Sequence, residues 1–260
     1  MDAASSAPER QNRRLRQFLA WCVHGYTALG LVAAAIMAVL IVRGDAAAFH
    51  WVFALMFVAT LIDATDGPLA RLVGVKEVLP GFDGRRLDDL IDFLTYTCLP
   101  LLLIWRAELL PGGQEWWLLL PLLASAYGFS QANAKTDDGF FLGFPSYWNL
   151  VAFYMYVLRL PGAAAVAVLV FLAGLTFVPI RYLSPNQRGV ANRSAWIPIV
   201  FWIAMLLWLL ARLLASPVID ATTWWLTLAS LFFPVYYLLV SWGMNARRWR
   251  KKRGGSASRR

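Results

Sequence analysis

The sequence predicts an all-α protein that crosses a membrane several times, and three observations support this fold class. Hydrophobic residues occupy 60% of the 260 positions and charged residues only 15%, whereas soluble domains carry roughly 25% charged residues. Charge-poor stretches recur along the chain, and several reach the roughly 20 residues that a helix needs to cross a bilayer. Basic residues gather in alternate connections between these stretches. A soluble single domain is therefore excluded, and a polytopic helical bundle is predicted.

About eight apolar stretches are expected to form transmembrane helices. They are residues 17–42, 46–62, 93–105, 116–134, 139–158, 160–180, 194–211 and 221–246. The third stretch is short when it is counted from Phe93, but a helix that begins near Gly84 has full length. Arg159, Pro161 and Gly162 form a turn signal between the fifth and sixth stretches.

The distribution of Lys and Arg predicts the orientation of the bundle. With eight spans both termini lie on the same side of the membrane, and that side carries 20 of the 24 basic residues. The other side carries Arg43, Arg106, Arg159 and Arg212. The positive-inside rule places both termini in the cytosol. Topology thus explains the net charge of +9, and we expect no nucleic acid among the partners.

One membrane domain is expected, with a short basic segment at each end. Residues 1–17 are predicted to lie along the cytosolic membrane surface, where Arg side chains meet anionic lipid. Residues 18–246 form the transmembrane domain, and residues 247–260 form a basic cytosolic tail. Cys22 and Cys98 both lie within apolar stretches, so neither a disulfide nor a cysteine metal site is predicted.

Aspartates gather where the second and third spans reach the cytosolic face. Six aspartates fall within thirty positions there, in a chain with only 15 acidic residues, and carboxylates near the membrane interior are usually functional. Asp63 and Asp66 lie about one helical turn apart, and so do Asp88 and Asp92. Two antiparallel helices would therefore present two pairs of carboxylates to each other across a cleft.

Converging carboxylates repel one another unless a cation lies between them. Oxygen ligands with no His or Cys nearby favour Mg²⁺ or Mn²⁺ over Zn²⁺, and such sites keep coordination positions open for phosphate oxygens. Small residues at Gly67, Ala70 and Gly84 leave room for a ligand against the backbone. The alternative is that the acids pair with nearby arginines at a wet helix end. We expect this for Asp83 and Asp89, because Asp89 points about 100° away from the neighbouring stripe of acids.

The spacing of these residues resembles the signature of the CDP-alcohol phosphotransferases, D-xx-D-G-xx-A-R-x(n)-G-xxx-D-xxx-D. All eight defining positions are present: Asp63, Asp66, Gly67, Ala70, Arg71, Gly84, Asp88 and Asp92. Twelve residues separate the two halves, which is longer than the gap in most of the family. This gap and the eight spans are similar to the bacterial phosphatidylcholine synthase branch.

The resemblance implies an enzyme of phospholipid synthesis in the bacterial inner membrane. It would condense CDP-diacylglycerol with choline, release CMP and require Mn²⁺ or Mg²⁺; homodimers are common in the family. The residues implied to hold one or two metal ions are Asp63, Asp66, Asp88 and Asp92. The residues implied to border the nucleotide and its phosphates are Gly67, Ala70, Arg71 and Gly84. Asp92 is also the expected catalytic base, because it is the acid deepest along its helix.

The acceptor pocket is not defined by this motif. Aromatic faces bind quaternary ammonium groups, so Tyr147, Trp148 and Tyr182 are candidate choline contacts, although an aromatic belt at the membrane interface also explains them. Arg181 and Arg188 are candidate phosphate contacts, although the positive-inside rule accounts for them equally well.

Two alternative functions stay open at this point. Serine, inositol or a phosphorylated polyol would suit the same motif as acceptor. An ion-coupled transporter would also place acids within a membrane protein. Such sites lie near the midplane between broken helices of two repeats, whereas these acids lie at one face and the sequence shows no repeat.

Overall fold

The structure is a computed structural model of the 260-residue chain, and it describes residues 7–131, 141–182, 190–216 and 218–257. Most of these residues are helical. The long helices are α1 (Ala7–Arg43), α2 (Ala46–Val73), α9 (Val190–Ala215) and α11 (Phe232–Ala257). The shorter ones are α3 (Val75–Val78), α4 (Gly84–Asp92), α5 (Leu99–Arg106), α6 (Leu119–Ser130), α7 (Trp148–Leu158), α8 (Gly162–Thr176) and α10 (Ala221–Ser230). A π-helical turn, η1 (Phe93–Cys98), joins α4 to α5, and a 3₁₀ turn, η2 (Glu115–Leu118), precedes α6.

The predicted all-α membrane class is confirmed. Among the described residues, four helices are long and apolar enough to cross a membrane: Gln11–Arg43, Ala46–Val73, Ile197–Ala215 and Ala221–Ala246. The helices α7 and α8 are apolar but shorter. All eight predicted stretches contain helix, while the number of crossings and the sidedness of the termini stay predictions.

Two of the predicted stretches differ in detail from the structure. The fifth was expected to be helical over residues 139–158, but α7 begins only at Trp148. Pro145 and the positive φ of Ser146, +55°, interrupt a helix there, because proline and left-handed backbone both break the regular hydrogen-bond pattern. The eighth stretch divides into α10 and α11 at Leu231. Pro234 follows Ser230 by four residues, so it cannot donate the helical bond to the Ser230 carbonyl.

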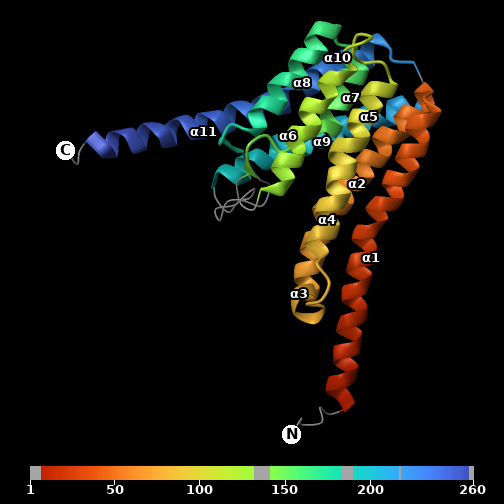
Figure 1. Ribbon diagram of the computed structural model, residues 1–260, viewed down its shortest axis with the longest axis vertical. Helices are drawn as coiled ribbons and strands as arrows, with labels where there is room; N and C mark the ends of the chain where they lie inside the picture. Colours follow the sequence, from red (N-terminus) through yellow and green to blue (C-terminus); the bar gives the residue numbers. More distant parts are fainter. Residues whose placement is uncertain (1–6, 132–140, 183–189, 217, 258–260) are drawn as a thin grey trace.

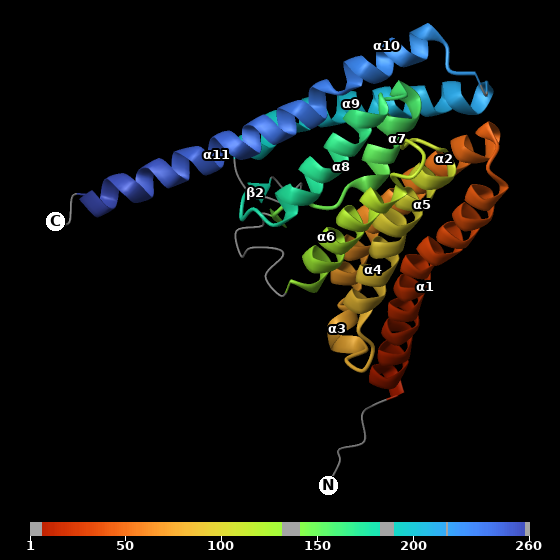
Figure 2. The same cartoon turned by 45° about the horizontal axis from the view of Figure 1, so that its top comes forward.

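The helices pack into a layered bundle. In Figure 1, α1, α2 and the continuous helix from α4 to α5 run side by side, with α6, α7 and α8 beside them. Figure 2 shows α9 and α11 lying along one another across the bundle, with the end of α11 projecting away from it. The core lies between α2, α5, α7 and α8, where Phe53 packs edge-to-face on Phe153 at 5.4 Å. Two short antiparallel strands, β1 (Phe141–Leu142) and β2 (Arg181–Tyr182), pair beside it.

Caps at both ends of α2 determine where its polar residues lie. Asp45 caps the first turn by accepting a 2.9 Å hydrogen bond from the Ala48 amide. Gly74 ends the helix in a left-handed conformation, φ +69°, which glycine adopts without steric cost. The chain then turns through α3, and Asp83 caps the start of α4. This short connection brings the polar ends of α2 and α4 together.

Candidate metal centre and active site

Three of the four predicted metal-binding carboxylates come together. One oxygen atom from each of Asp63, Asp88 and Asp92 lies within 4.8 Å of the others, and all three side chains are partly buried. Asp63 is on α2, whereas Asp88 and Asp92 are one turn apart on α4. Oxygen ligands about 2.1 Å from a Mg²⁺ ion lie roughly 3–4 Å from one another. The group therefore fits a hard divalent cation with little adjustment.

Tyr96 belongs to this cluster, and the sequence analysis missed it. Its buried hydroxyl donates a 2.8 Å hydrogen bond to Oδ2 of Asp63. Tyr96 follows Asp92 by four residues and Asp88 by eight, so it continues the stripe of acids for one more turn. That spacing was the available signal. A tyrosine in an apolar stretch is normally interpreted as a packing or interface residue. Only its sequence separation from Asp88 and Asp92 indicates that it lies beside the acids.

The helix widens where it carries Tyr96. The π-helical turn η1, Phe93–Cys98, begins directly after Asp92. A local cause lies two residues beyond it, because the ring of Pro100 would clash with the carbonyl of Tyr96 in a regular α-helix. Wide turns of this kind are frequent at functional sites. Here the turn connects the acid-bearing α4 to the buried α5.

The fourth predicted ligand, Asp66, is hydrogen-bonded to a side chain of α1. It is only 6% exposed and accepts a 2.8 Å hydrogen bond at Oδ2 from the hydroxyl of Thr27 on α1. A second bond joins the same two helices, 2.7 Å between the hydroxyls of Tyr26 and Thr65. The predicted set of four ligands is thus found as a group of three, with Asp66 on the next turn of α2 and held from α1.

The small residues of the motif are close-packed. A Cβ atom at Gly84 would lie 2.5 Å from Cε1 of His24, so the imidazole occupies the space that any side chain there would need. A Cβ atom at Gly67 would lie 3.4 Å from Nη1 of Arg71. Ala70, which lies between Gly67 and Gly84 in the sequence, is half-buried. Within the described part of the chain, the buried Nε2 of His24 has no hydrogen-bond partner.

Comparison with characterised proteins decides the family. The chain is 36% identical over 189 residues to a phosphatidylcholine synthase of Legionella pneumophila, and the aligned region covers 70% of this chain and 71% of that protein. It is 31% identical over 188 residues to a phosphatidylcholine synthase of Borreliella burgdorferi, with coverage of 72% and 79%. For the protein of that name from Legionella bozemanae the identity is 37% over 163 residues, with coverage of 61% and 75%. No protein-family model matches the chain.

The chain belongs to the phosphatidylcholine synthase family. The predicted resemblance to this branch is confirmed, and so is the prediction of an enzyme of phospholipid synthesis.

In this member of the phosphatidylcholine synthase family, Asp83 and Asp89 form ordinary helix-end pairs. The Asp83 carboxylate accepts a 3.2 Å bond from the Arg86 amide and pairs with the Arg86 guanidinium at 3.2 Å. Asp89 lies 4.0 Å from Arg85. Exposed pairs of this kind contribute about 1 kcal/mol or less. The simpler role expected for Asp83 and Asp89 is confirmed.

Tyr147 is the predicted acceptor contact that lies at the cluster. Its ring centroid is 6.3 Å from that of Tyr96, and its phenol lies within electrostatic range of Asp63 and Asp92. Trp148 is different, because it is fully buried and donates a 2.7 Å hydrogen bond to Ser125. Trp148 therefore packs between α6 and α7, and a choline contact at this residue stays a prediction.

The remaining candidates lie at the β2 strand. Tyr182 is fully buried, stacks on Tyr237 with centroids 6.0 Å apart and accepts a 3.4 Å bond from Trp242. Tyr182 thus packs against α11, and an acceptor contact at this residue stays a prediction. The backbone of Arg181 exchanges hydrogen bonds of 3.1 and 2.8 Å with the Asn245 amide. Arg188 lies outside the described residues.

Proposed function

We propose that this chain transfers the phosphatidyl group of CDP-diacylglycerol to choline, with Mn²⁺ or Mg²⁺ bound by the aspartate cluster. Family membership supports the product, phosphatidylcholine. The observation that carries the mechanism is the approach of Asp63, Asp88 and Asp92 to within 4.8 Å. We further propose a multi-pass enzyme of the bacterial inner membrane with about eight spans, cytosolic termini and the active site at the cytosolic face. A homodimer is compatible with this arrangement.

Asp63, Asp88 and Asp92 would hold the metal, with Asp66 available on the adjacent turn of α2. A bound divalent ion neutralises the charge that develops on CMP as the anhydride bond breaks. Tyr96 orients the Asp63 carboxylate through its hydrogen bond to Oδ2. Partners that orient metal ligands in this way typically change metal affinity or activity by about 10- to 100-fold.

Asp92 is the proposed base. The choline oxygen attacks the phosphorus that bears the diacylglycerol, its proton passes to the Asp92 carboxylate, and the bond from that phosphorus to the CMP oxygen breaks. Of the cluster's two α4 acids, Asp92 is the later and lies nearer Tyr96 along the helix. A positioned base contributes roughly 10²- to 10⁴-fold to the rate.

The nucleotide is proposed to lie along the small residues of the motif. Gly67 and Ala70 add little side-chain bulk on this side of α2, Gly84 lets His24 pack against α4, and the Arg71 guanidinium beside Gly67 supplies positive charge for a phosphate. His24 packs on Gly84 and forms the α1 wall of this region. We therefore include α1 in the nucleotide side of the site.

Choline is proposed to bind between the aromatic rings and the acids. Tyr96 and Tyr147 present rings 6.3 Å apart beside Asp63 and Asp92. Aromatic faces and carboxylates attract a quaternary ammonium group that has no N–H to donate. Serine and inositol lack this group, so the arrangement favours choline over them.

The proposal is tested by supplying purified protein with labelled CDP-diacylglycerol, Mn²⁺ and a panel of alcohols. We expect phosphatidylcholine and CMP in equal amounts with choline, and slower reaction with dimethylaminoethanol. Chelation should stop the reaction, and Mg²⁺ or Mn²⁺ should restore it better than Ca²⁺, which prefers looser and higher coordination. Equal rates with serine or inositol would refute the choice of choline.

A further inference from the structure

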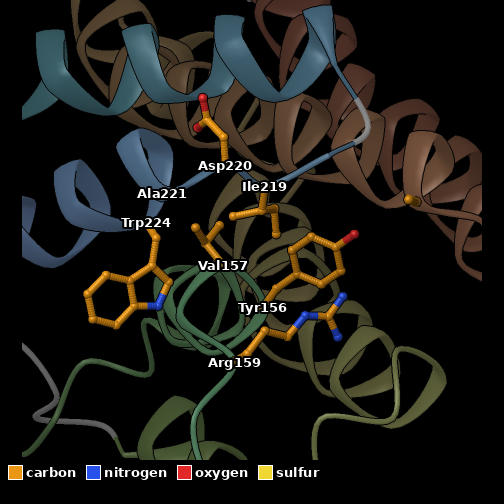
Figure 3. A pocket seen from close by; sticks show the side chains of 8 residues that line it. Tyr156, Val157, Arg159, Ile219, Asp220, Ala221 and Trp224 are labelled. Carbon is orange, nitrogen blue, oxygen red and sulfur yellow. The ribbon is translucent and has the colours of Figure 1, made fainter.

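A cavity lies at the other end of α2 from the aspartate cluster. It has a volume of about 450 Å³ and includes Ala46, the first residue of α2. Asp63 follows Ala46 by 17 residues, or about 25 Å along the helix at 1.5 Å per residue. Figure 3 shows the side chains that line the cavity, which include Tyr156, Val157, Arg159, Ile219, Asp220 and Trp224. This cavity is therefore distinct from the proposed active site.

Arg159 makes the cavity positively charged. Its guanidinium lies 4.8 Å from the centroid of the Tyr156 ring, and within the described residues it has no carboxylate partner. The acid of the cavity, Asp220, is already neutralised by Arg212 at 2.6 Å. Hydrogen bonds from Thr223 lower the pKa of Asp220, so it stays a carboxylate and keeps this pairing. The remaining charge at the cavity is that of Arg159.

Two of the other three arginines predicted on this side of the membrane pair with acids, Arg43 with Asp45 and Arg212 with Asp220. The third, Arg106, packs against the backbone at Gly44 and does not line the cavity. An arginine with an aromatic neighbour and no acid partner is suited to an external anion, because its planar guanidinium matches the oxygens of a phosphate.

The turn that carries Arg159 is held in place. Arg159 has φ +49° between α7 and α8, and the carbonyl of the preceding Leu158 accepts a 3.1 Å hydrogen bond from the Trp224 indole. The Arg159 side chain thus starts from a defined backbone position on the cavity wall. Figure 3 shows it beside Tyr156, with Trp224 across the cavity.

We propose that this cavity binds the phosphodiester headgroup of an anionic phospholipid, with the phosphate against Arg159. The chain is a membrane protein, and the cavity lies among helix ends, where headgroups meet the hydrocarbon region. Tyr156, Val157, Ile219 and Trp224 supply an amphipathic and apolar wall for the glycerol and the first acyl carbons. Arginine and phosphate form paired, charge-assisted hydrogen bonds, which a neutral headgroup carbonyl cannot match.

Native mass spectrometry of the purified full-length chain with added phosphatidylglycerol tests this proposal. We expect Arg159→Gln to weaken the tightest phosphatidylglycerol adduct at least tenfold, and Arg43→Gln, at an arginine that is already paired, to leave it unchanged. Lipid bound to the basic tail is common to all variants and cancels in the comparison. Equal retention by the wild type and Arg159→Gln would overturn the proposal. Displacement of the lipid by millimolar inorganic phosphate would show that free phosphate is the ligand instead.

A second measurement uses only the wild-type chain, so it does not depend on how the variants fold. A photoreactive phosphatidylglycerol analogue in detergent micelles should label peptides that contain residues 156–160 or 219–224. Competition with unlabelled phosphatidylglycerol should remove this labelling. Labelling confined to other peptides would contradict the site.

Discussion

The hydroxyl of Tyr96 donates a 2.8 Å hydrogen bond to Oδ2 of Asp63. This bond joins the helix that carries Asp88 and Asp92 to the helix that carries Asp63, directly beside the group of three carboxylates. It engages one oxygen of Asp63 and limits rotation of that carboxylate. Tyr96 is therefore a positioning residue for the proposed metal centre.

Replacing Tyr96 by Phe keeps the ring and removes the hydrogen bond. We expect the Mn²⁺ concentration for half-maximal activity to rise about 10- to 100-fold, with saturating Mn²⁺ restoring most of the rate. Activity measured against Mn²⁺ concentration checks this. Tyr154→Phe is the matched control, because Tyr154 is also buried and hydrogen-bonded, but to Ser230. An unchanged Mn²⁺ dependence in Tyr96→Phe would remove its positioning role.

Replacing Thr27 by Val removes the hydroxyl that holds Asp66 from α1. Leaving a buried carboxylate without its hydrogen bond destabilises it by about 1–3 kcal/mol. Asp66 would then no longer be held in place beside the carboxylate group, so we expect kcat/KM for CDP-diacylglycerol to fall roughly tenfold or more. Thr27→Ser keeps the hydroxyl and should stay near wild-type activity. Steady-state kinetics of the two variants provide the comparison. If Thr27→Val keeps activity and Thr27→Ser loses it, the methyl group of Thr27 is what matters and the bond to Asp66 is not.

Asp92→Asn tests the proposed base. The amide keeps the shape of the carboxylate, so we expect binding of CDP-diacylglycerol to persist while transfer to choline falls at least a hundredfold. The residual rate should also lose the rise with pH of the wild type, because no carboxylate remains at this position to be deprotonated. Lipid binding and a pH–rate profile measure the two effects separately. A variant that keeps both rate and profile would move the base to another group.

Tyr147→Ala tests the proposed choline contact. Loss of one aromatic face costs about 1–2 kcal/mol of cation binding, so we expect the KM for choline to rise about 5- to 30-fold, with little change in the KM for CDP-diacylglycerol. Tyr147→Phe retains the ring and should bind choline nearly as well as the wild type. A Tyr147→Ala variant with an unchanged KM for choline would place the acceptor elsewhere.

Much of the fold could be predicted from the sequence, because long apolar stretches and glycine signals are local. The helix that begins at Gly84 and the turn at Arg159 were found in this way. The late start of α7 and the break at Leu231 were missed, because the apolar pattern continues across Pro145 and Pro234 while the backbone does not.

The carboxylate group was predictable for a different reason. Helical spacing placed Asp88 and Asp92 on one stripe, and a short connection returned them to Asp63. The bond from Thr27 to Asp66 spans 39 residues, and the contact of His24 with Gly84 is similarly distant. Such contacts depend on how α1 packs against α2 and α4, and no local pattern in α1 indicates them.

The neighbouring aspartates Asp88 and Asp89 allow the most direct test of the metal centre. Asp88 belongs to the carboxylate group, while Asp89 lies near Arg85 at the surface of the same helix. Binding of Mn²⁺ to the purified protein, followed by electron paramagnetic resonance together with CMP release, should be lost in Asp88→Ala and retained in Asp89→Ala. Normal Mn²⁺ binding and turnover in Asp88→Ala would contradict a metal centre formed by Asp63, Asp88 and Asp92.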